Sequence, residues 1–138
     1  MSPPKSRILC VEDDPDTRDL LFFILSKADY EITCTEDAVE GLRLARSERF
    51  DLFVLDNWLP KMSGEDLCRE VRKMNTHTPI VFYSAAAFER DKQRAYDAGA
   101  QGYLVKPVDE TNLIEEIVRL IDASEVLVPI ALVSHRAD

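Results

Sequence analysis

Short strand-like runs alternate with longer helix-like stretches along most of this chain. Each of the five runs is four to five residues long and consists mainly of apolar or β-branched residues. Strands that alternate with helices are joined by right-handed crossovers, which make the strands parallel and place helices on both faces of the sheet. The pattern therefore predicts one α/β domain. Its strands are expected at Arg7–Val11, Glu31–Thr35, Leu52–Leu55, Ile80–Tyr83 and Gly102–Val105.

The stretches between these runs contain signals of helix ends and helix faces. Asp14 is a suitable N-cap, and Pro15 suits the first position of a helix. In the second stretch Val39, Leu42 and Ala45 recur at helical spacing and are expected to share the packed face. Helices are therefore predicted from Pro15 onward and over Asp37–Ser47, Ser63–Met74, Glu89–Ala98 and Glu110–Ala123.

The overall composition limits the class of partner and the compartment. The 138 residues suit one domain, and 17 basic against 26 acidic side chains give a net charge of -9. That charge repels nucleic acid phosphates and anionic lipids, so no direct nucleic acid partner is expected. No apolar run reaches the ~20 residues needed to cross a bilayer, so the chain is predicted to be cytoplasmic and free of the membrane. The three widely spaced cysteines are predicted to be reduced and buried.

Polar side chains follow four of the five predicted strands. The carboxyl ends of parallel strands meet at one edge of a sheet, where such folds bind ligands. Two carboxylates ~4 Å apart repel by ~4 kcal/mol at an effective dielectric constant of ~20, so Asp13 beside Asp56 needs a cation. Mg²⁺ prefers one or two carboxylates together with water and phosphate oxygens. The side chains at these strand ends are Glu12, Asp13, Asp56, Ser84 and Lys106.

The same groups suit phosphoryl transfer to a carboxylate. Asp56 can act as the nucleophile, while a divalent ion, Lys106 and the Ser84 hydroxyl stabilise charge on the phosphoryl oxygens. The neighbouring Asp14 is interpreted as a helix cap only. The residues therefore predict a magnesium-dependent phosphoacceptor site.

Four segments together resemble the receiver domain of two-component response regulators, and the resemblance runs from about Arg7 to about Ile121. It implies a flavodoxin-like (βα)5 doubly wound sandwich, with five parallel strands in the order 2-1-3-4-5 and helices on both faces. It also divides the chain into an N-terminal extension (1–6), a receiver domain (7–123) and an apolar C-terminal tail (124–138). The segments are Ile8–Pro15 (ILCVEDDP), Leu55–Gly64 (LDNWLPKMSG), Tyr83–Ala86 (YSAA) and Ala98–Pro107 (AGAQGYLVKP).

The resemblance implies a role for each acidic residue of the site. Asp56 is the expected phosphoacceptor. The Mg²⁺ ligands are expected to be Asp13 and Asp56 directly, Glu12 through water, and the backbone carbonyl of Trp58. No other cofactor is implied.

The resemblance also implies a switch and its partners. Ser84 and Lys106 would bind the new phosphoryl oxygens, and Tyr103 would swing toward Ser84, which remodels the surface of the fourth helix, fifth strand and fifth helix. A cis peptide bond is expected between Lys106 and Pro107. The implied phosphodonor is a sensor histidine kinase or histidine phosphotransfer protein, and the implied output is a downstream protein target. The chain would assist its own phosphorylation and dephosphorylation without being an enzyme for another substrate.

Two positions flank the expected route of the water that would remove the phosphoryl group. They hold Trp58 and Ala86, neither of which has a polar side chain that orients water well. Slow self-dephosphorylation is therefore predicted. Trp58 is equally well interpreted as a partly exposed aromatic that packs on its loop, and the two interpretations are compatible.

An apolar run, Val126–Val133, follows the last predicted helix. Because Pro129 interrupts a helix or a central strand, an extended segment is expected that packs on its own domain or on a second copy, which would make a homodimer. A partly disordered tail is the alternative.

Three other functions fit the sequence less well than a phosphoacceptor. An aspartyl-nucleophile phosphatase usually has a second acid two residues after the nucleophile, where this chain has Trp58. A nucleotide or flavin site needs a glycine-rich phosphate loop, which the four glycines do not form. A receiver-like interaction module that is never phosphorylated would not need the complete polar set at the strand ends.

Overall fold

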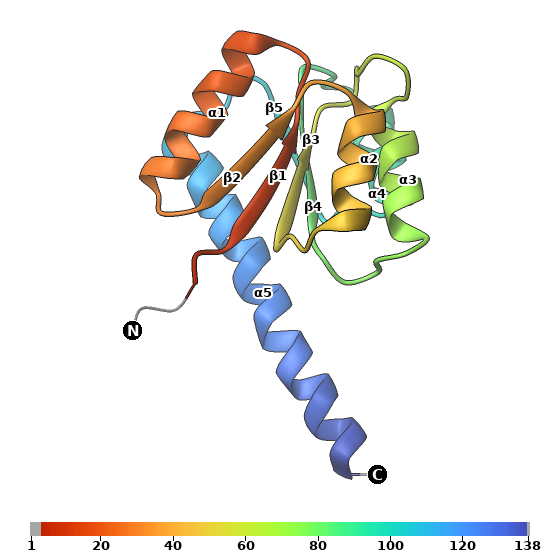
Figure 1. The fold of residues 1–138 in the computed structure, drawn as a ribbon. Coiled ribbons are helices and arrows are strands. Elements are labelled where there is room, and N and C mark those ends of the chain that lie inside the picture. Colours follow the sequence, from red (N-terminus) through yellow and green to blue (C-terminus); the bar gives the residue numbers. More distant parts are fainter. Residues whose placement is uncertain (1–3, 138) are drawn as a thin grey trace.

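The five strands form one parallel sheet in the order β2-β1-β3-β4-β5 (Figure 1). The computed structural model describes residues 4–137, with side chains described for residues 4–125. Each strand begins at the predicted residue, and the fourth ends one residue later than predicted, at Ser84. The predicted strand order and parallel sheet are therefore confirmed. The strands are β1 (Arg7–Val11), β2 (Glu31–Thr35), β3 (Leu52–Leu55), β4 (Ile80–Ser84) and β5 (Gly102–Val105).

Side-chain caps begin the first three helices. Asp14 accepts a hydrogen bond from the backbone N–H of Thr17, and Asp37 and Ser63 cap the next two helices in the same way. Such a cap contributes about 1 kcal/mol, because it satisfies a backbone donor that the helix leaves free. The helices are α1 (Pro15–Lys27), α2 (Ala38–Ser47), α3 (Gly64–Arg72), α4 (Glu89–Ala98) and α5 (Glu110–Ala137).

The sheet buries both of its faces. In β1, Leu9 and Val11 belong to the core cluster shared with α2, α3 and α4, while Ile8 and Cys10 belong to the cluster shared with α1 and α5. This alternation follows from the two-residue period of a strand. Figure 1 shows the same two layers of helices, one on each side of the sheet.

The packed face of α2 differs from the predicted one. Val39 is 50% exposed, whereas Ala38, Gly41 and Leu42 face the core. A Cβ atom placed on Gly41 would lie 2.8 Å from Val11 Cγ2, so a small residue is needed where the helix approaches β1. The close approach of Ala38 and Gly41 to the sheet therefore decides which face of α2 is buried, and Val39 is left half-exposed.

Helix α5 is longer than predicted and runs past the sheet (Figure 1). The prediction of an extended segment over Val126–Val133 was wrong, because the backbone remains helical through Pro129 to Ala137. A proline inside a helix costs about 3 kcal/mol, but a helix already formed on the domain continues without a new nucleation step. None of the helices in the described part of the chain combines the length and apolar character that a membrane crossing requires.

A single guanidinium ties together the amino-terminal ends of β4 and β5. Arg72 Nη1 donates to the carbonyl oxygens of Thr78, at 2.8 Å, and Asn75, at 3.1 Å. Its Nε donates to Gly99 O at 3.0 Å, and its Nη2 donates to Gln101 Oε1 at 2.6 Å. Partial burial lowers the pKa of Arg72 from its ordinary value. The end of the sheet opposite to Asp56 is thus held by hydrogen bonds to neutral oxygen atoms.

Candidate phosphoacceptor and metal site

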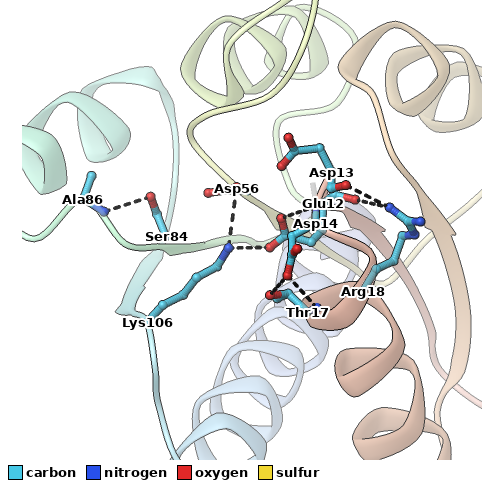
Figure 2. Close-up of polar contacts among 9 residues, drawn as sticks. All are labelled: Glu12, Asp13, Asp14, Thr17, Arg18, Asp56, Ser84, Ala86 and Lys106. Carbon is cyan, nitrogen blue, oxygen red and sulfur yellow. Dashed lines mark hydrogen bonds and ion pairs between the residues drawn. The ribbon is translucent and has the colours of Figure 1, made fainter.

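The carboxyl ends of β1 and β3 bring three carboxylates together (Figure 2). Oxygen atoms of Glu12, Asp13 and Asp56 all lie within 4.8 Å of one another. Glu12 is 2% exposed and Asp56 6% exposed, while Asp13 is exposed to solvent. The predicted convergence of these side chains is therefore observed.

Lys106, at the end of β5, reaches into this acidic cluster. Its Nζ donates to Glu12 Oε1 at 2.5 Å and lies 3.5 Å from Asp56 Oδ2 (Figure 2). Burial lowers the pKa of Lys106, but the hydrogen bond to Glu12 and the charge of Asp56 outweigh it, so the net pKa is raised. Burial and the charge of Asp56 also raise the pKa of Glu12, although Lys106 opposes that shift. One ammonium is therefore paired with two of three clustered carboxylates, which leaves an excess of negative charge.

One oxygen of Asp56 lacks a hydrogen-bond partner among the residues that the structure describes. Asp56 Oδ1 is buried and accepts no hydrogen bond from any residue that the structure describes. A buried, unpaired carboxylate oxygen costs free energy unless a cation or donor reaches it. Carboxylate oxygens are also the ligands that Mg²⁺ prefers. The donor set and the charge of the cluster therefore fit a divalent metal ion.

The loop after β3 is packed closely around Asp56. Gly64 N donates to Asn57 O at 2.9 Å, and Asn57 Nδ2 donates to Glu65 Oε2 at 3.1 Å. A Cβ atom on Gly64 would lie 2.1 Å from the Asp56 carbonyl oxygen, so only glycine fits there. Trp58, in contrast, is 63% exposed, which agrees with its interpretation as an exposed loop aromatic. Sequence reasoning missed buried Asn57, although an amide two residues after a buried strand is a signal that could have found it.

Ser84 and Tyr103 hold the same residue of the loop after β4. Ser84 is fully buried and accepts a hydrogen bond from Ala86 N at 3.2 Å, while the Tyr103 hydroxyl donates to Ala86 O at 2.6 Å. The Tyr103 ring stacks on Phe82, with ring centroids 5.9 Å apart. Burial raises the pKa of Tyr103. The backbone of Ala86 thus connects Ser84 and Tyr103, the two residues predicted to form the switch. No sequence signal indicates this role.

Two residues of α1 support the acidic turn. Asp14 Oδ2 accepts hydrogen bonds from both the N–H and the hydroxyl of Thr17, so its predicted role as a cap is confirmed. Arg18 Nη1 donates to the carbonyl oxygens of Glu12, at 3.0 Å, and Asp13, at 3.3 Å (Figure 2). Sequence reasoning missed Arg18. A basic residue one turn after an acidic loop could have indicated it. The predicted cis bond between Lys106 and Pro107 is present.

Solved structures of the same architecture match nearly the whole chain. A CheY-like response regulator receiver domain from Methanospirillum hungatei is 31% identical, with a TM-score of 0.84 over 88% of this chain and 97% of that one. The receiver domain of a sensor histidine kinase from Pseudomonas aeruginosa, solved with a magnesium ion coordinated in its active-site cleft, is 29% identical. Its TM-score is 0.81, over 86% of this chain and 98% of that one.

Sequence relatives give the same assignment. The alkaline phosphatase synthesis transcriptional regulatory protein PhoP of Bacillus subtilis is 31% identical over 123 residues, which cover 89% of this chain and 51% of that protein. The chain thus spans about half the length of this curated relative. Residues 8–118 match the family described as response regulator receiver domain. With its fold and its strand-end residues in agreement, the chain belongs to the receiver domain family of two-component response regulators.

Proposed function

We propose that this receiver accepts a phosphoryl group on Asp56 from a phosphohistidine partner in a magnesium-dependent reaction. The observation that supports this most is the buried Asp56 Oδ1, which has no hydrogen-bond partner in the described part of the chain. Such an oxygen is available to a metal ion or to an incoming phosphorus atom. The alternative of an interaction module that is never phosphorylated gives no reason for this costly arrangement.

The metal ion is expected at the acidic cluster. Asp13 and Asp56 would bind Mg²⁺ directly, Glu12 would bind it through water, and Trp58 would contribute its backbone carbonyl. When bound, the ion supplies positive charge that neutralises the phosphoryl oxygens. The three close carboxylates and their single ammonium support this assignment.

The side chains of the site divide the chemistry among them. The Asp56 carboxylate attacks phosphorus while the bond to the donor histidine breaks, and the histidine nitrogen leaves with the electron pair. Lys106 Nζ and the Ser84 hydroxyl bind the transferred oxygens. Because Ser84 and Tyr103 both hold Ala86, a shift of Ser84 changes the loop that leads into α4. The surface of α4, β5 and α5 is thereby proposed as the output face, and the chain assists its own phosphorylation and dephosphorylation.

The partners we propose are a sensor histidine kinase or histidine phosphotransfer protein, a downstream protein target, and a second copy of the chain. The B. subtilis relative is named as a transcriptional regulatory protein, but this chain spans only 51% of it. The net charge of -9 supports the proposal that the residues of this chain do not bind nucleic acid directly. We propose a cytoplasmic location.

Fluorescence of Trp58 tests the phosphoacceptor proposal, since it is the one tryptophan and is exposed beside the site. Addition of beryllofluoride, or of a small phosphodonor, with Mg²⁺ is expected to change the emission of the native chain. The response should be lost in Asp56→Asn and retained in Asp14→Asn, the matched control on the same rim. Equal responses in both variants, or no response in the native chain, would contradict the proposal and favour the interaction module.

A further inference from the structure

Two cysteine side chains occupy adjacent positions on neighbouring strands. Cys10 of β1 and Cys34 of β2 are paired in the register of these parallel strands, which lie side by side in Figure 1. Cys10 belongs to the core cluster that includes residues of α1 and α5, and Cys34 packs against that cluster. Both thiols are free. The two side chains therefore point to the same face of the sheet.

The spacing of paired parallel strands suits a disulfide bond. Neighbouring strands lie about 4.8 Å apart, and disulfides join residues whose Cα atoms are about 4.4 to 6.8 Å apart. A bond between Cys10 and Cys34 therefore requires no change of strand register. Cys68, in contrast, lies in α3 and belongs to the core cluster on the other face of the sheet. The sheet thus separates the third thiol from the pair.

The two paired thiols differ in exposure and in reactivity. Cys10 is fully buried, whereas Cys34 is half-buried on an edge strand. A hydrogen bond to Cys10 lowers the pKa of Cys34 and outweighs the effect of burial, and the charge of Arg18 lowers it further against that of Asp19. Oxidants react with the thiolate form of cysteine, which a lower pKa and access to solvent favour. Cys34 is therefore expected to react first, with Cys10 directly beside it.

We propose that Cys34 and Cys10 form a reversible disulfide bond when the chain meets a hydroperoxide. The Cys34 thiolate attacks the terminal oxygen, the O–O bond breaks, and Cys34 becomes a sulfenic acid while the oxidant leaves as hydroxide or alkoxide. The Cys10 sulfur then attacks the Cys34 sulfur and the S–O bond breaks. The hydroxyl group leaves with the proton of Cys10 as water. Two electrons pass from the thiol pair to the hydroperoxide, and a thiol reductant returns them.

The bond would lie beside the acidic turn that follows β1. Val11 and Thr35 form the next pair in the register, and Glu12 N donates to Thr35 O at 3.0 Å. The disulfide would therefore fix β2 to β1 two residues before Glu12, and it would close a loop that contains all of α1. The reaction needs neither Mg²⁺ nor a phosphodonor. Its outcome is thus independent of the phosphoryl transfer proposed for Asp56.

Mass spectrometry of the full chain tests the bond. The reduced chain is treated with hydrogen peroxide, and the remaining thiols are alkylated after unfolding. Of the three cysteines, only Cys68 should then carry an alkyl group, and digestion without reductant should release a linked peptide pair that contains Cys10 and Cys34. Dithiothreitol should restore alkylation of all three. Absence of this linked pair after a treatment that fully oxidises glutathione would overturn the proposal, as would a disulfide that joins two chains.

Single substitutions test the order of the two steps. In Cys10→Ala, peroxide should leave a sulfenic acid on Cys34, which dimedone labels; in Cys34→Ala, the buried Cys10 should remain a thiol. Cys68→Ala, the matched change on the other face of the sheet, should form the disulfide as fast as the native chain. Equal dimedone labelling of Cys10 and Cys34 in the two variants would contradict the proposed order. Circular dichroism verifies folding, and the native peptide map decides the question if a variant does not fold.

Discussion

Glu12 and Asp56 share Lys106 as a counter-ion although both carboxylates are almost fully buried. The ammonium lies closer to Glu12 than to Asp56, at 2.5 against 3.5 Å. Asp56 is therefore the less completely neutralised of the two. That imbalance leaves uncompensated negative charge on Asp56, the proposed phosphoacceptor, even though its side chain is hidden from bulk water.

Removing the ammonium should therefore destabilise the fold in a metal-dependent way. Lys106→Met is expected to lower the free energy of unfolding by about 2 to 4 kcal/mol, because it leaves buried carboxylates without a counter-ion. Urea unfolding with and without Mg²⁺ measures this, and Mg²⁺ should restore part of the loss. The control is Lys61→Met, whose ion pair with Asp37 is exposed, and its cost should stay below about 1 kcal/mol. Similar losses in both variants would contradict the reading of Lys106 as a buried counter-ion.

The residue that shapes the loop beside Asp56 is Gly64. Gly64→Ala should cost about 3 kcal/mol or more, since its new Cβ would lie 2.1 Å from the Asp56 carbonyl oxygen and the backbone must move. Gly41→Ala is the matched change, because its Cβ would meet a methyl group of Val11 that can move, and the loss should be smaller. Chemical unfolding of both variants compares them. A smaller loss for Gly64→Ala than for Gly41→Ala would show that the loop tolerates a side chain.

Titration of Cys68 should make the free energy of unfolding depend on pH in the alkaline range. Burial raises the pKa of this thiol from 9.0 to about 11, although Arg72 and Arg69 oppose the shift. The folded state therefore keeps the proton that the unfolded state loses, so this stability is complete below pH 9.0 and is lost as the pH rises to about 11. The free energy of unfolding should fall by about 2 to 3 kcal/mol across that window. Cys68→Ala should show a flatter profile, and equal slopes would remove Cys68 as the cause.

At the scale of helices and strands, local signals predicted most of the fold and of the site. Strand starts followed from apolar runs, and the start of the first helix followed from Asp14 and Pro15, since both signals act within a few residues. Val39 was placed wrongly because the close approach of α2 to β1 is a tertiary effect. Cys34 is only half-buried, since β2 is an edge strand with one neighbour. The contacts of Ala86 with Ser84 and Tyr103 were missed because they are made by its backbone.

The two loops beside Asp56 set the expected lifetime of the phosphorylated state. Trp58 and Ala86 offer no polar side chain to orient water, so phosphate release is expected to be slow. Trp58→Asn should accelerate release at least several-fold, because an amide can hydrogen-bond to the attacking water. A time course of phosphate release from each phosphorylated chain measures this. Loss from the native chain within seconds, or no acceleration in the variant, would contradict the argument.

At the scale of the whole molecule, the core clusters formed by residues 4–125, whose side chains the structure describes, end short of the projecting part of α5. The buried residues nearest to that end are Leu120 and Ile121. A chain that ends at Glu125 should therefore unfold cooperatively, with a free energy within about 1 kcal/mol of the native chain measured at a concentration where it is monomeric. Its response to beryllofluoride should also be unchanged. A molten or insoluble truncated chain would show that the receiver domain does not end near residue 123.

The hydrogen bonds of Arg72 should make the two ends of the sheet respond differently to ionic strength. Dissolved salt screens charges, and Lys106 is 20% exposed at the rim, so salt should weaken its pairing with Glu12 and Asp56, although less than it weakens a fully exposed pair. The acceptors of Arg72 are neutral oxygen atoms, and screening affects such hydrogen bonds much less. Backbone amide exchange should therefore become faster with salt around Asp56 and remain steady around Thr78 and Gln101. The amino-terminal ends of β4 and β5 would then stay fixed while the loops at the carboxyl ends of the strands change conformation.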